Sequence, residues 1–314
     1  MKNFISIHDV TDVAELIAQA QYFKENPFND KIGVNKTLIL LFFNPSLRTR
    51  LSTQIAAQNL GMQVISMDVG QTWGIEFQNG AVMDEDKAEH IMEAARVVSS
   101  YGQIVGIRSF AGLKDRSEDY QDEVINKFTS LSLCPVINLE SAIRHPLQSL
   151  TDAITIETYK KVKRPKVVLT WAPHPRALPQ AVSNSFIEWM KALDVELVVT
   201  HPKGFELDPQ FSQNVRIEYN QAEAFKDAHF IYAKNWSSVT NYGQTALELR
   251  NWTVTAAKMA LTDQAYFMHC LPVRRNVIVE DVVIDSERSL VIPQAANRIC
   301  AAQAVIANLL RHGQ

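Results

Sequence analysis

The chain has 314 residues, of which 46% are hydrophobic and 21% are charged, and its formal net charge is −3 at pH 7. This composition is typical of a globular protein large enough for two domains. No long basic block, no apolar run of about 18 residues and no basic-then-apolar leader occurs, which disfavours nucleic-acid binding, a membrane span and a signal peptide. A cytoplasmic protein is the simplest interpretation.

The three cysteines, Cys134, Cys270 and Cys300, are odd in number and form no CxxC pair. This spacing argues against a disulfide framework or a zinc knuckle, so we expect free thiols. Neither a GxGxxG nor a P-loop pattern is present, which disfavours an enzyme that uses a nucleotide cofactor. We therefore expect neither a cofactor nor a metal.

Short β-rich apolar runs alternate with helical patterns along the chain. In the first half, strands are predicted at residues 37–43, 63–68, 104–110 and 135–139. In the second half, they are predicted at residues 166–171, 195–200, 230–234, 266–269 and 290–293. Such alternation indicates βαβ units and parallel sheets. We predict an α/β fold with two doubly wound parallel-sheet domains and a cleft between them.

A long helical pattern at residues 145–164 separates the two sets of strands, and an Ala-rich helical pattern closes the chain at residues 295–310. We expect the last helix to pack back on the first domain. The predicted division is therefore a first domain of residues 1–142 together with 295–314, and a second domain of residues 143–294.

Polar side chains follow the predicted strands in both halves of the chain. Because the carboxyl ends of parallel strands share one edge of a sheet, a ligand site is expected there. The residues at these ends are mainly basic or imidazole groups: Arg48, Arg108, Arg144, His145, His174, Arg176, Lys234, Arg274 and Arg275.

The strongest local signal is Asn44-Pro45-Ser46-Leu47-Arg48-Thr49-Arg50, which joins a predicted strand to a predicted helix. Leu51, Ile55 and Leu60 supply the apolar spacing of that helix, and Gly61 its end. With Ser46 near the N-cap, the backbone N–H groups of the first turn could bind a phosphate, assisted by Arg48 and Arg50. The alternative is an ordinary capped helix with two solvated arginines.

This motif resembles the Ser-Thr-Arg-Thr-Arg loop of the transcarbamylases, although Leu47 and Asn44 depart from the usual residues. Two further family motifs follow in order, His145-Pro146-Leu147-Gln148 with Asp152, and His269-Cys270-Leu271-Pro272. The resemblance covers nearly the whole chain. It implies a homotrimer with active sites shared between subunits and, by analogy with one branch of the family, a knot in the second domain.

Within the family, the chain is most similar to the carbamoyltransferases that act on N-acetylornithine or N-succinylornithine. The Trp73 loop and residues 171–176, 234–236 and 269–276 carry this similarity. The Ser-Met-Gly loop of enzymes for free ornithine is not recognisable. The resemblance implies that carbamoyl phosphate and an N-acylornithine are the ligands, in an arginine-forming pathway.

The resemblance also implies a role for individual residues. The residues implied to be catalytic are Thr49, Arg108 and His145, which would bind the carbonyl oxygen, and Gln148, which would bind the carbamoyl NH2. The residues implied to bind carbamoyl phosphate are Ser46, Leu47, Arg48, Thr49, Trp73, Arg108, His145, Gln148, Leu271 and Arg298. The residues implied to surround the acceptor are Glu140, His174, Lys234, Cys270, Arg274 and Ala88.

The acyl group is predicted from the loop that contains Ala88. By resemblance, acetyl-specific enzymes carry Glu at this position and succinyl-specific enzymes carry Pro. Ala leaves room and no negative charge, which favours succinyl. Ile278 and residues 273–276 agree with that choice. N-acetylornithine remains the alternative acceptor.

Other interpretations of these residues remain open. The chain could be a silent protein that binds carbamoyl phosphate without catalysis. His174 and His269 could be structural, the three tryptophans Trp73, Trp171 and Trp236 could serve packing, and Glu140 could form a plain ion pair with Lys234.

Overall fold

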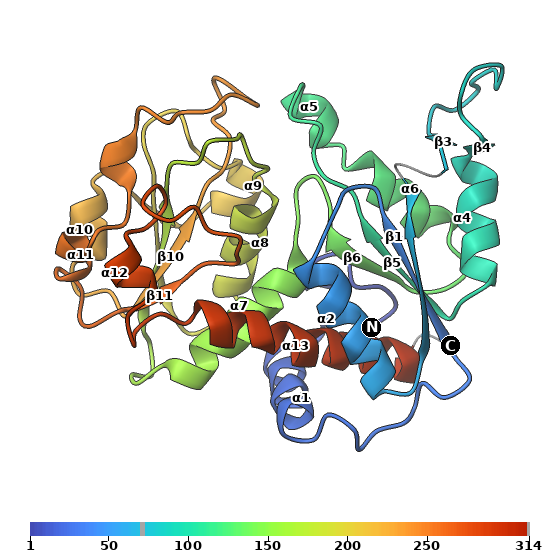
Figure 1. The fold of residues 1–314 in the computed structure, drawn as a ribbon, viewed down its shortest axis with the longest axis horizontal. Helices are drawn as coiled ribbons and strands as arrows, with labels where there is room; N and C mark the ends of the chain where they lie inside the picture. Colours follow the sequence, from blue (N-terminus) through green and yellow to red (C-terminus); the bar gives the residue numbers. More distant parts are fainter. Residues whose placement is uncertain (70–72, 313–314) are drawn as a thin grey trace. The chain divides into compact units, whose positions relative to one another are not determined.

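The computed structural model describes residues 1–69 and 73–312, which form two compact units (Figure 1). Unit 1 consists of Met1–Ala111, Ser117–Leu147 and Arg298–Gln314, and unit 2 of Gly112–Arg116 and Gln148–Asn297. The divisions thus fall within helices, a few residues beyond the sequence-based limits at 142 and 294. Among the described residues, no helix has the length and apolar character needed to cross a membrane.

Unit 1 is built on a parallel sheet with the strand order β2-β1-β5-β6. Its helices lie on both sides, with α4 and α6 on one face and α1, α2 and part of α13 on the other (Figure 1). The central strands are buried because both faces are covered. The strands are β1 (Thr37–Phe42), β2 (Gln63–Asp68), β5 (Ile104–Arg108) and β6 (Val136–Glu140).

Unit 1 contains the helices that cover its sheet and two short helices, η1 and α5. Apart from α13, the helices of unit 1 are η1 (Ile7–Asp9), α1 (Val13–Glu25), α2 (Arg48–Asn59), α4 (Ile91–Ser100) and α6 (Glu123–Leu131); α5 (Arg116–Asp119) lies where the two units meet in sequence. A small parallel pair, β3 (Ile75–Glu76) and β4 (Glu89–His90), precedes α4.

The helix α2 packs differently from the apolar spacing in the sequence. Leu60 is buried, and Gly61 follows it with φ +89°, as expected for a helix end. Leu51 and Ile55, however, are 49% and 40% exposed. Small residues such as Ala56 form the buried face instead. Because the apolar side chains point to solvent, α2 leaves an apolar stripe on the surface of unit 1.

Unit 2 is built on a parallel sheet with the strand order β11-β10-β7-β8-β9. In Figure 1, α8 and α9 lie on one face and α10, α11 and α12 on the other. The reversal of strand order at β7 and β10 is the pattern of a doubly wound sheet. The strands are β7 (Lys166–Trp171), β8 (Glu196–Thr200), β9 (Arg216–Glu218), β10 (Phe230–Lys234) and β11 (Tyr266–Met268).

The helices of unit 2 begin with α7, whose first residues belong to unit 1, and end with α13, which continues into unit 1. They are α7 (Pro146–Tyr159), α8 (Ala181–Met190), α9 (Pro209–Ser212), α10 (Gln221–Phe225), η2 (Arg250–Trp252), α11 (Ala256–Met259), α12 (Asp281–Ile284) and α13 (Val291–His312).

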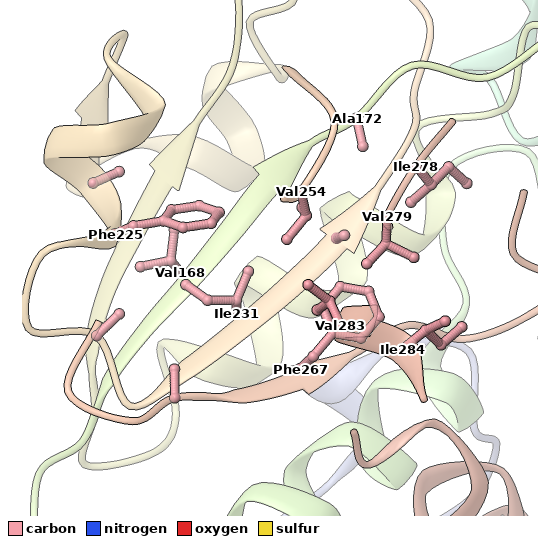
Figure 2. Close-up of a cluster of buried hydrophobic side chains, with 14 of the residues drawn as sticks. Val168, Ala172, Phe225, Ile231, Val254, Phe267, Ile278, Val279, Val283 and Ile284 are labelled. Carbon is pink, nitrogen blue, oxygen red and sulfur yellow. The ribbon is translucent and has the colours of Figure 1, made fainter. Parts of the chain in front are cut away.

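The apolar core on one face of the unit 2 sheet is shown in Figure 2. Val168, Ile231 and Phe267 come from three neighbouring strands, and Phe225 and Val283 reach them from α10 and α12. These side chains are buried. Burying one such side chain contributes about 1.5–3 kcal/mol to the free energy of folding. This apolar layer therefore holds the strands of the unit 2 sheet, and with them the strand ends, in a fixed arrangement.

Two features of the sheets differ from the sequence-based prediction. Residues 290–293 are not a strand, because Val291 begins α13 and Pro293 lies in its first turn, where its missing N–H costs nothing. A four-residue apolar run cannot by itself distinguish a strand from a helix start. The edge strand β9 was missed because its sequence, Arg-Ile-Glu, carries little apolar signal.

The predicted packing of the C-terminal helix on the first domain is confirmed. Within unit 1, Asn59 of α2 donates to Gln303 of α13 (3.2 Å), and Gln303 donates to the Pro27 carbonyl (2.7 Å). Arg311 of α13 also pairs with Asp30 (2.8 Å). These bonds fix the position of α13 against α2, the helix that follows the Pro45-Ser46 loop.

A buried carboxyl group anchors the loop between β6 and α7. Asp122 accepts hydrogen bonds from the Ser141 hydroxyl (2.7 Å) and the Ala142 N–H (3.0 Å). It has φ +49°, a conformation that Asp and Asn tolerate better than most residues. Burial raises the pKa of Asp122, and the two hydrogen bonds oppose this only in part.

We expect Asp122→Asn to alter how stability depends on pH. Because the folded-state pKa of Asp122 is raised, the folded chain binds its proton more tightly, so this group's contribution to stability is complete below the unfolded pKa and is lost as the pH rises through the folded pKa. Asn has no charge to desolvate. Denaturant unfolding from about pH 4 to about pH 8 should show the variant gaining on the wild type as the pH rises. A constant difference in the free energy of unfolding would contradict this.

Candidate active site

The loop after β1 leads into α2 without a side-chain cap. Leu47, not Ser46, occupies the N-cap position, and its apolar side chain makes no capping hydrogen bond. Ser46, expected near the N-cap, directly precedes it. The N–H groups of the first turn, which begins at Arg48, form the positive end of the helix. Such an end favours a bound anion.

Thr49 lies in this first turn and is buried. Its hydroxyl oxygen accepts a hydrogen bond from Nη2 of Arg298, on α13, at 2.7 Å. Because the oxygen accepts this bond, the hydroxyl hydrogen is left to donate to another group. The C-terminal arginine and the α2 threonine predicted from the sequence to share a ligand are thus neighbours in unit 1.

Arg108 ends β5 and is held from several sides. Its Nη1 donates to the backbone carbonyls of Asn44 (3.1 Å) and Pro45 (2.7 Å), directly before Ser46. Its guanidinium also stacks over the Phe110 ring at 4.0 Å. A guanidinium with this many partners has a fixed direction.

Glu140, at the end of β6, is the acidic partner of this arginine. Its Oε2 lies 3.1 Å from Nη2 of Arg108 and 3.6 Å from Nε2 of His145. All three side chains are buried. Glu140 was predicted to contact the acceptor, or to pair with Lys234; the ion pair seen here joins it to Arg108.

The second predicted arginine of the loop, Arg50, has a structural partner. It forms an ion pair with Asp68 at the end of β2 and stacks over the Phe42 ring at 4.3 Å. The sequence-based suggestion that Arg50 adds to an anion site therefore receives no support from its contacts.

Trp73 and Ala88 lie next to each other in unit 1. The Ala88 N–H donates to the Gly74 carbonyl (2.9 Å), and the Trp73 indole N–H donates to Glu89 Oε2 (2.9 Å). Both residues are exposed. The pairing of β3 with β4 therefore brings Trp73 and Ala88 together on the surface. From the sequence, Trp73 was predicted to contact carbamoyl phosphate and Ala88 the acceptor.

In unit 2, Gln148 and the loop after β11 are both rigidly held. Gln148 is buried, and its Nε2 donates to Asp152 Oδ1 at 2.7 Å. Leu271 adopts φ +53°, and its N–H donates to Nδ1 of His269 at 2.9 Å. The half-buried thiol of Cys270 lies between them in sequence. A β-carbon at positive φ is strained, so this loop persists because its surroundings hold it.

The remaining predicted acceptor residues gather around His174. Burial lowers the pKa of His174, and the positive charges of Lys234, Arg274 and Arg176 lower it further, against a hydrogen bond with the Arg176 carbonyl. These residues come from the ends of β7, β10 and β11. A neutral imidazole among three cations is a suitable site for carboxylate groups.

Some residues near the predicted ligand-binding residues were not singled out from the sequence. Arg176 was noted only as one of the basic residues at strand ends, and Gln294, which bonds to Asp152, was not singled out at all. Arg275, next to Arg274, pairs with Asp281 and Asp285 instead. Trp171 and Trp236 are fully buried core residues. Each indole N–H donates to a backbone carbonyl.

In the described ranges, no group of three or more His, Cys, Asp or Glu residues could hold a metal ion. Cys134, Cys270 and Cys300, which all lie within the described ranges, form no disulfide bond.

Both parts of the chain match domain models of one family. The carbamoyl-P binding domain of aspartate/ornithine carbamoyltransferase matches residues 2–158, and the Asp/Orn binding domain matches residues 179–309.

Proteins that are similar to nearly the entire chain include two relatives and one solved structure. An N-succinylornithine carbamoyltransferase of Bacteroides fragilis (strain 638R) is 55% identical, covering 99% of each chain. An N-acetylornithine carbamoyltransferase of Xylella fastidiosa (strain Temecula1) is 35% identical, covering 98% of each. The structure is an N-acetyl-L-ornithine transcarbamylase, with one glutamate replaced by alanine, complexed with carbamyl phosphate and N-succinyl-L-norvaline. It is 34% identical with a TM-score of 0.93, over 98% of this chain and 100% of that one. The chain therefore belongs to the aspartate/ornithine carbamoyltransferase family.

Proposed function

We propose that the protein transfers the carbamoyl group of carbamoyl phosphate to the side-chain amine of N-succinyl-L-ornithine, giving N-succinyl-L-citrulline and phosphate. The observation that carries this proposal is the 55% identity, over 99% of both chains, to an N-succinylornithine carbamoyltransferase. N-acetyl-L-ornithine is the second candidate acceptor, supported by relatives at 35% identity.

In this proposal, unit 1 binds the phosphate and the carbonyl oxygen. The start of α2 supplies backbone N–H groups at Ser46 to Thr49, and Arg48, Arg108 and Arg298 supply positive charge. The Thr49 hydroxyl, whose oxygen already accepts from Arg298, donates to the carbonyl oxygen together with Arg108 and His145. Support comes from the fixed direction of Arg108, because donors positioned in advance stabilise charge that develops in the transition state.

The reaction proceeds by direct displacement. The neutral amine attacks the carbonyl carbon, negative charge grows on the carbonyl oxygen, and the bond from carbon to the phosphate oxygen then breaks. The amine gives up one proton, the departing phosphate takes up a proton, and hydrogen phosphate leaves. Unit 2 acts on the carbamoyl nitrogen, whose N–H groups donate to Gln148 Oε1 and to the Leu271 carbonyl.

The acceptor is proposed to bind near His174, Lys234 and Arg274. N-succinylornithine carries two carboxylates, its α-carboxylate and that of the succinyl group, whereas N-acetylornithine carries one. The three cations that affect His174 suit the dianion better. Ala88 itself brings no negative charge to the proposed acyl site, and the transcarbamylase variant with glutamate replaced by alanine was complexed with a succinyl ligand.

We also propose that the protein is a homotrimer in which Trp73 reaches the active site of a neighbouring subunit. Support comes from the surface of unit 1, where several large apolar side chains are exposed. These are Leu47, Leu51 and Ile55 along α2, Ile65 and Met67 on the edge strand β2, and Trp73 itself. Burying such a surface would stabilise an oligomer.

We expect turnover to be fastest with N-succinylornithine when it is compared with N-acetylornithine and ornithine at equal concentrations of carbamoyl phosphate. Ala88→Glu should lower kcat/KM for N-succinylornithine at least about tenfold, equivalent to about 1.4 kcal/mol, because like charges repel. Ala81→Glu places the same charge elsewhere between β3 and β4 and serves as the control. Faster turnover of N-acetylornithine by the wild type would reject the succinyl assignment, and no turnover with any acceptor would leave a silent binder.

Arg108→Lys should lower kcat at least about 100-fold while leaving the fold intact. An ammonium keeps the charge but cannot bond at once to Glu140 and to the two carbonyls as the fork of Arg108 does. The control is Arg216→Lys, at an exposed arginine that pairs with Glu196. A kcat within about threefold of the wild type would show that Arg108 does not stabilise the transition state.

Mixing inactive Trp73→Ala subunits with inactive Arg108→Ala subunits should restore part of the activity, because some sites in mixed trimers receive both intact residues. Mixing Thr49→Ala with Arg108→Ala subunits should restore none, since those two lesions lie in the same subunit's half of the site. Mixed trimers should be verified by native mass spectrometry. No recovery in them would reject the shared site.

A further inference from the structure

Asp152 is the centre of a buried hydrogen-bond network in unit 2. Its Oδ1 accepts from Nε2 of Gln148, one helical turn earlier on α7, at 2.7 Å, and from Nε2 of Gln294 on α13 at 2.6 Å. All three side chains are almost completely buried. Two amide groups from different helices therefore share one carboxylate oxygen.

The carboxylate determines which way the Gln148 amide faces, and together with the His269 N–H it orients the Gln294 amide. A primary amide has a donor at one end and an acceptor of nearly the same shape at the other, so packing alone does not orient it. The Asp152 oxygen accepts, and it draws the NH2 group of each glutamine toward itself. The Oε1 atoms of Gln148 and Gln294 consequently face away from Asp152, as hydrogen-bond acceptors.

The branch through Gln294 continues to the loop after β11. Gln294 Oε1 accepts the His269 N–H at 3.0 Å, and His269 Nδ1 accepts the Leu271 N–H at 2.9 Å. Because Nδ1 accepts, the neutral ring carries its proton on Nε2. The network ends at Leu271, whose φ of +53° costs about 1–2 kcal/mol and needs such support.

We infer that Asp152 is a positioning residue that keeps two acceptors, Gln148 Oε1 and the Leu271 carbonyl, directed at the carbamoyl NH2 group. This inference rests on the proposed function, in which carbamoyl phosphate is the ligand. One carboxylate orients both acceptors, one of them directly and the other through Gln294 and His269. Asp152 therefore gives the site its preference for NH2 over groups of similar size that cannot donate.

The test uses two stable analogues of carbamoyl phosphate that differ only at this group. Phosphonoacetamide carries the NH2, and phosphonoacetone carries a methyl group in its place. We expect the wild type to bind the amide at least about tenfold more tightly, measured as Kd by titration calorimetry, because the methyl ketone leaves both acceptors unpaired. In Asp152→Ala this ratio should fall to within about twofold of unity, while the Kd of phosphonoacetone stays within about twofold of the wild-type value.

A control variant separates positioning from a general loss of packing. Thr155→Val removes a different buried bond between α7 and α13, the one from Asn297 Nδ2 to Thr155 Oγ1 (3.0 Å). It should lower stability without changing the ratio of the two Kd values. If Asp152→Ala does not fold, Asp152→Asn decides: its amide offers a donor as well as an acceptor to the glutamines, so the ratio should fall at least about threefold.

Four results would overturn the inference. An unchanged ratio in the folded Asp152 variant would show that the carboxylate does not orient the acceptors. Equal weakening of both analogues would show a structural role only. A wild type that binds neither analogue would remove the proposed function and this inference with it, whereas a wild type that binds both equally would remove the inference alone.

Discussion

The burial of one guanidinium organises the candidate site of unit 1. Arg108 ends β5 in a position where few waters can reach it, and an unpaired charge there would cost several kcal/mol. The chain meets this demand with Glu140 from the end of β6 and the carbonyls of Asn44 and Pro45 from the end of β1. Three neighbouring strand ends are thereby fixed to one another. The helix α2 begins at Arg48, three residues after Pro45, so its position depends on the same arginine.

Unit 2 uses a carboxylate where unit 1 uses a guanidinium. Asp152 accepts hydrogen bonds from the amides of Gln148 and Gln294. Gln294 in turn bonds to His269, which bonds to the strained Leu271. In both units the ion makes bonds of 2.6–3.3 Å to groups on several elements. Low local dielectric strengthens the hydrogen bonds within such buried networks. This difference in charge agrees with the proposed roles of the two units. In that proposal, cations of unit 1 bind the phosphate and the carbonyl oxygen, and hydrogen-bond acceptors of unit 2 bind the carbamoyl nitrogen.

Most of the architecture could be predicted from residue patterns. The strands β1, β2, β7 and β10 lie within one residue of their predicted limits, because each is a continuous or alternating apolar run bounded by polar residues. The failures share a cause. Residues 290–293 and β9 are too short to have a period, and the outward direction of Leu51 and Ile55 depends on which face of α2 meets the rest of unit 1. The knot, the trimer and the cytoplasmic location remain predictions.

The sequence by itself determined the family, through three motifs in the expected order, and the chemical types of the groups available. It also located those groups at strand ends, because parallel strands carry their carboxyl ends to one edge. Only the tertiary structure decided which partner each group has: Glu140 pairs with Arg108, Arg50 pairs with Asp68, and Arg298 meets Thr49. A hydrogen bond between atoms far apart in the chain requires their positions to be accurate to about a few tenths of an ångström, and no local pattern encodes such positions. For the same reason the role inferred for Asp152 emerged from the fold, since its second partner lies 142 positions away.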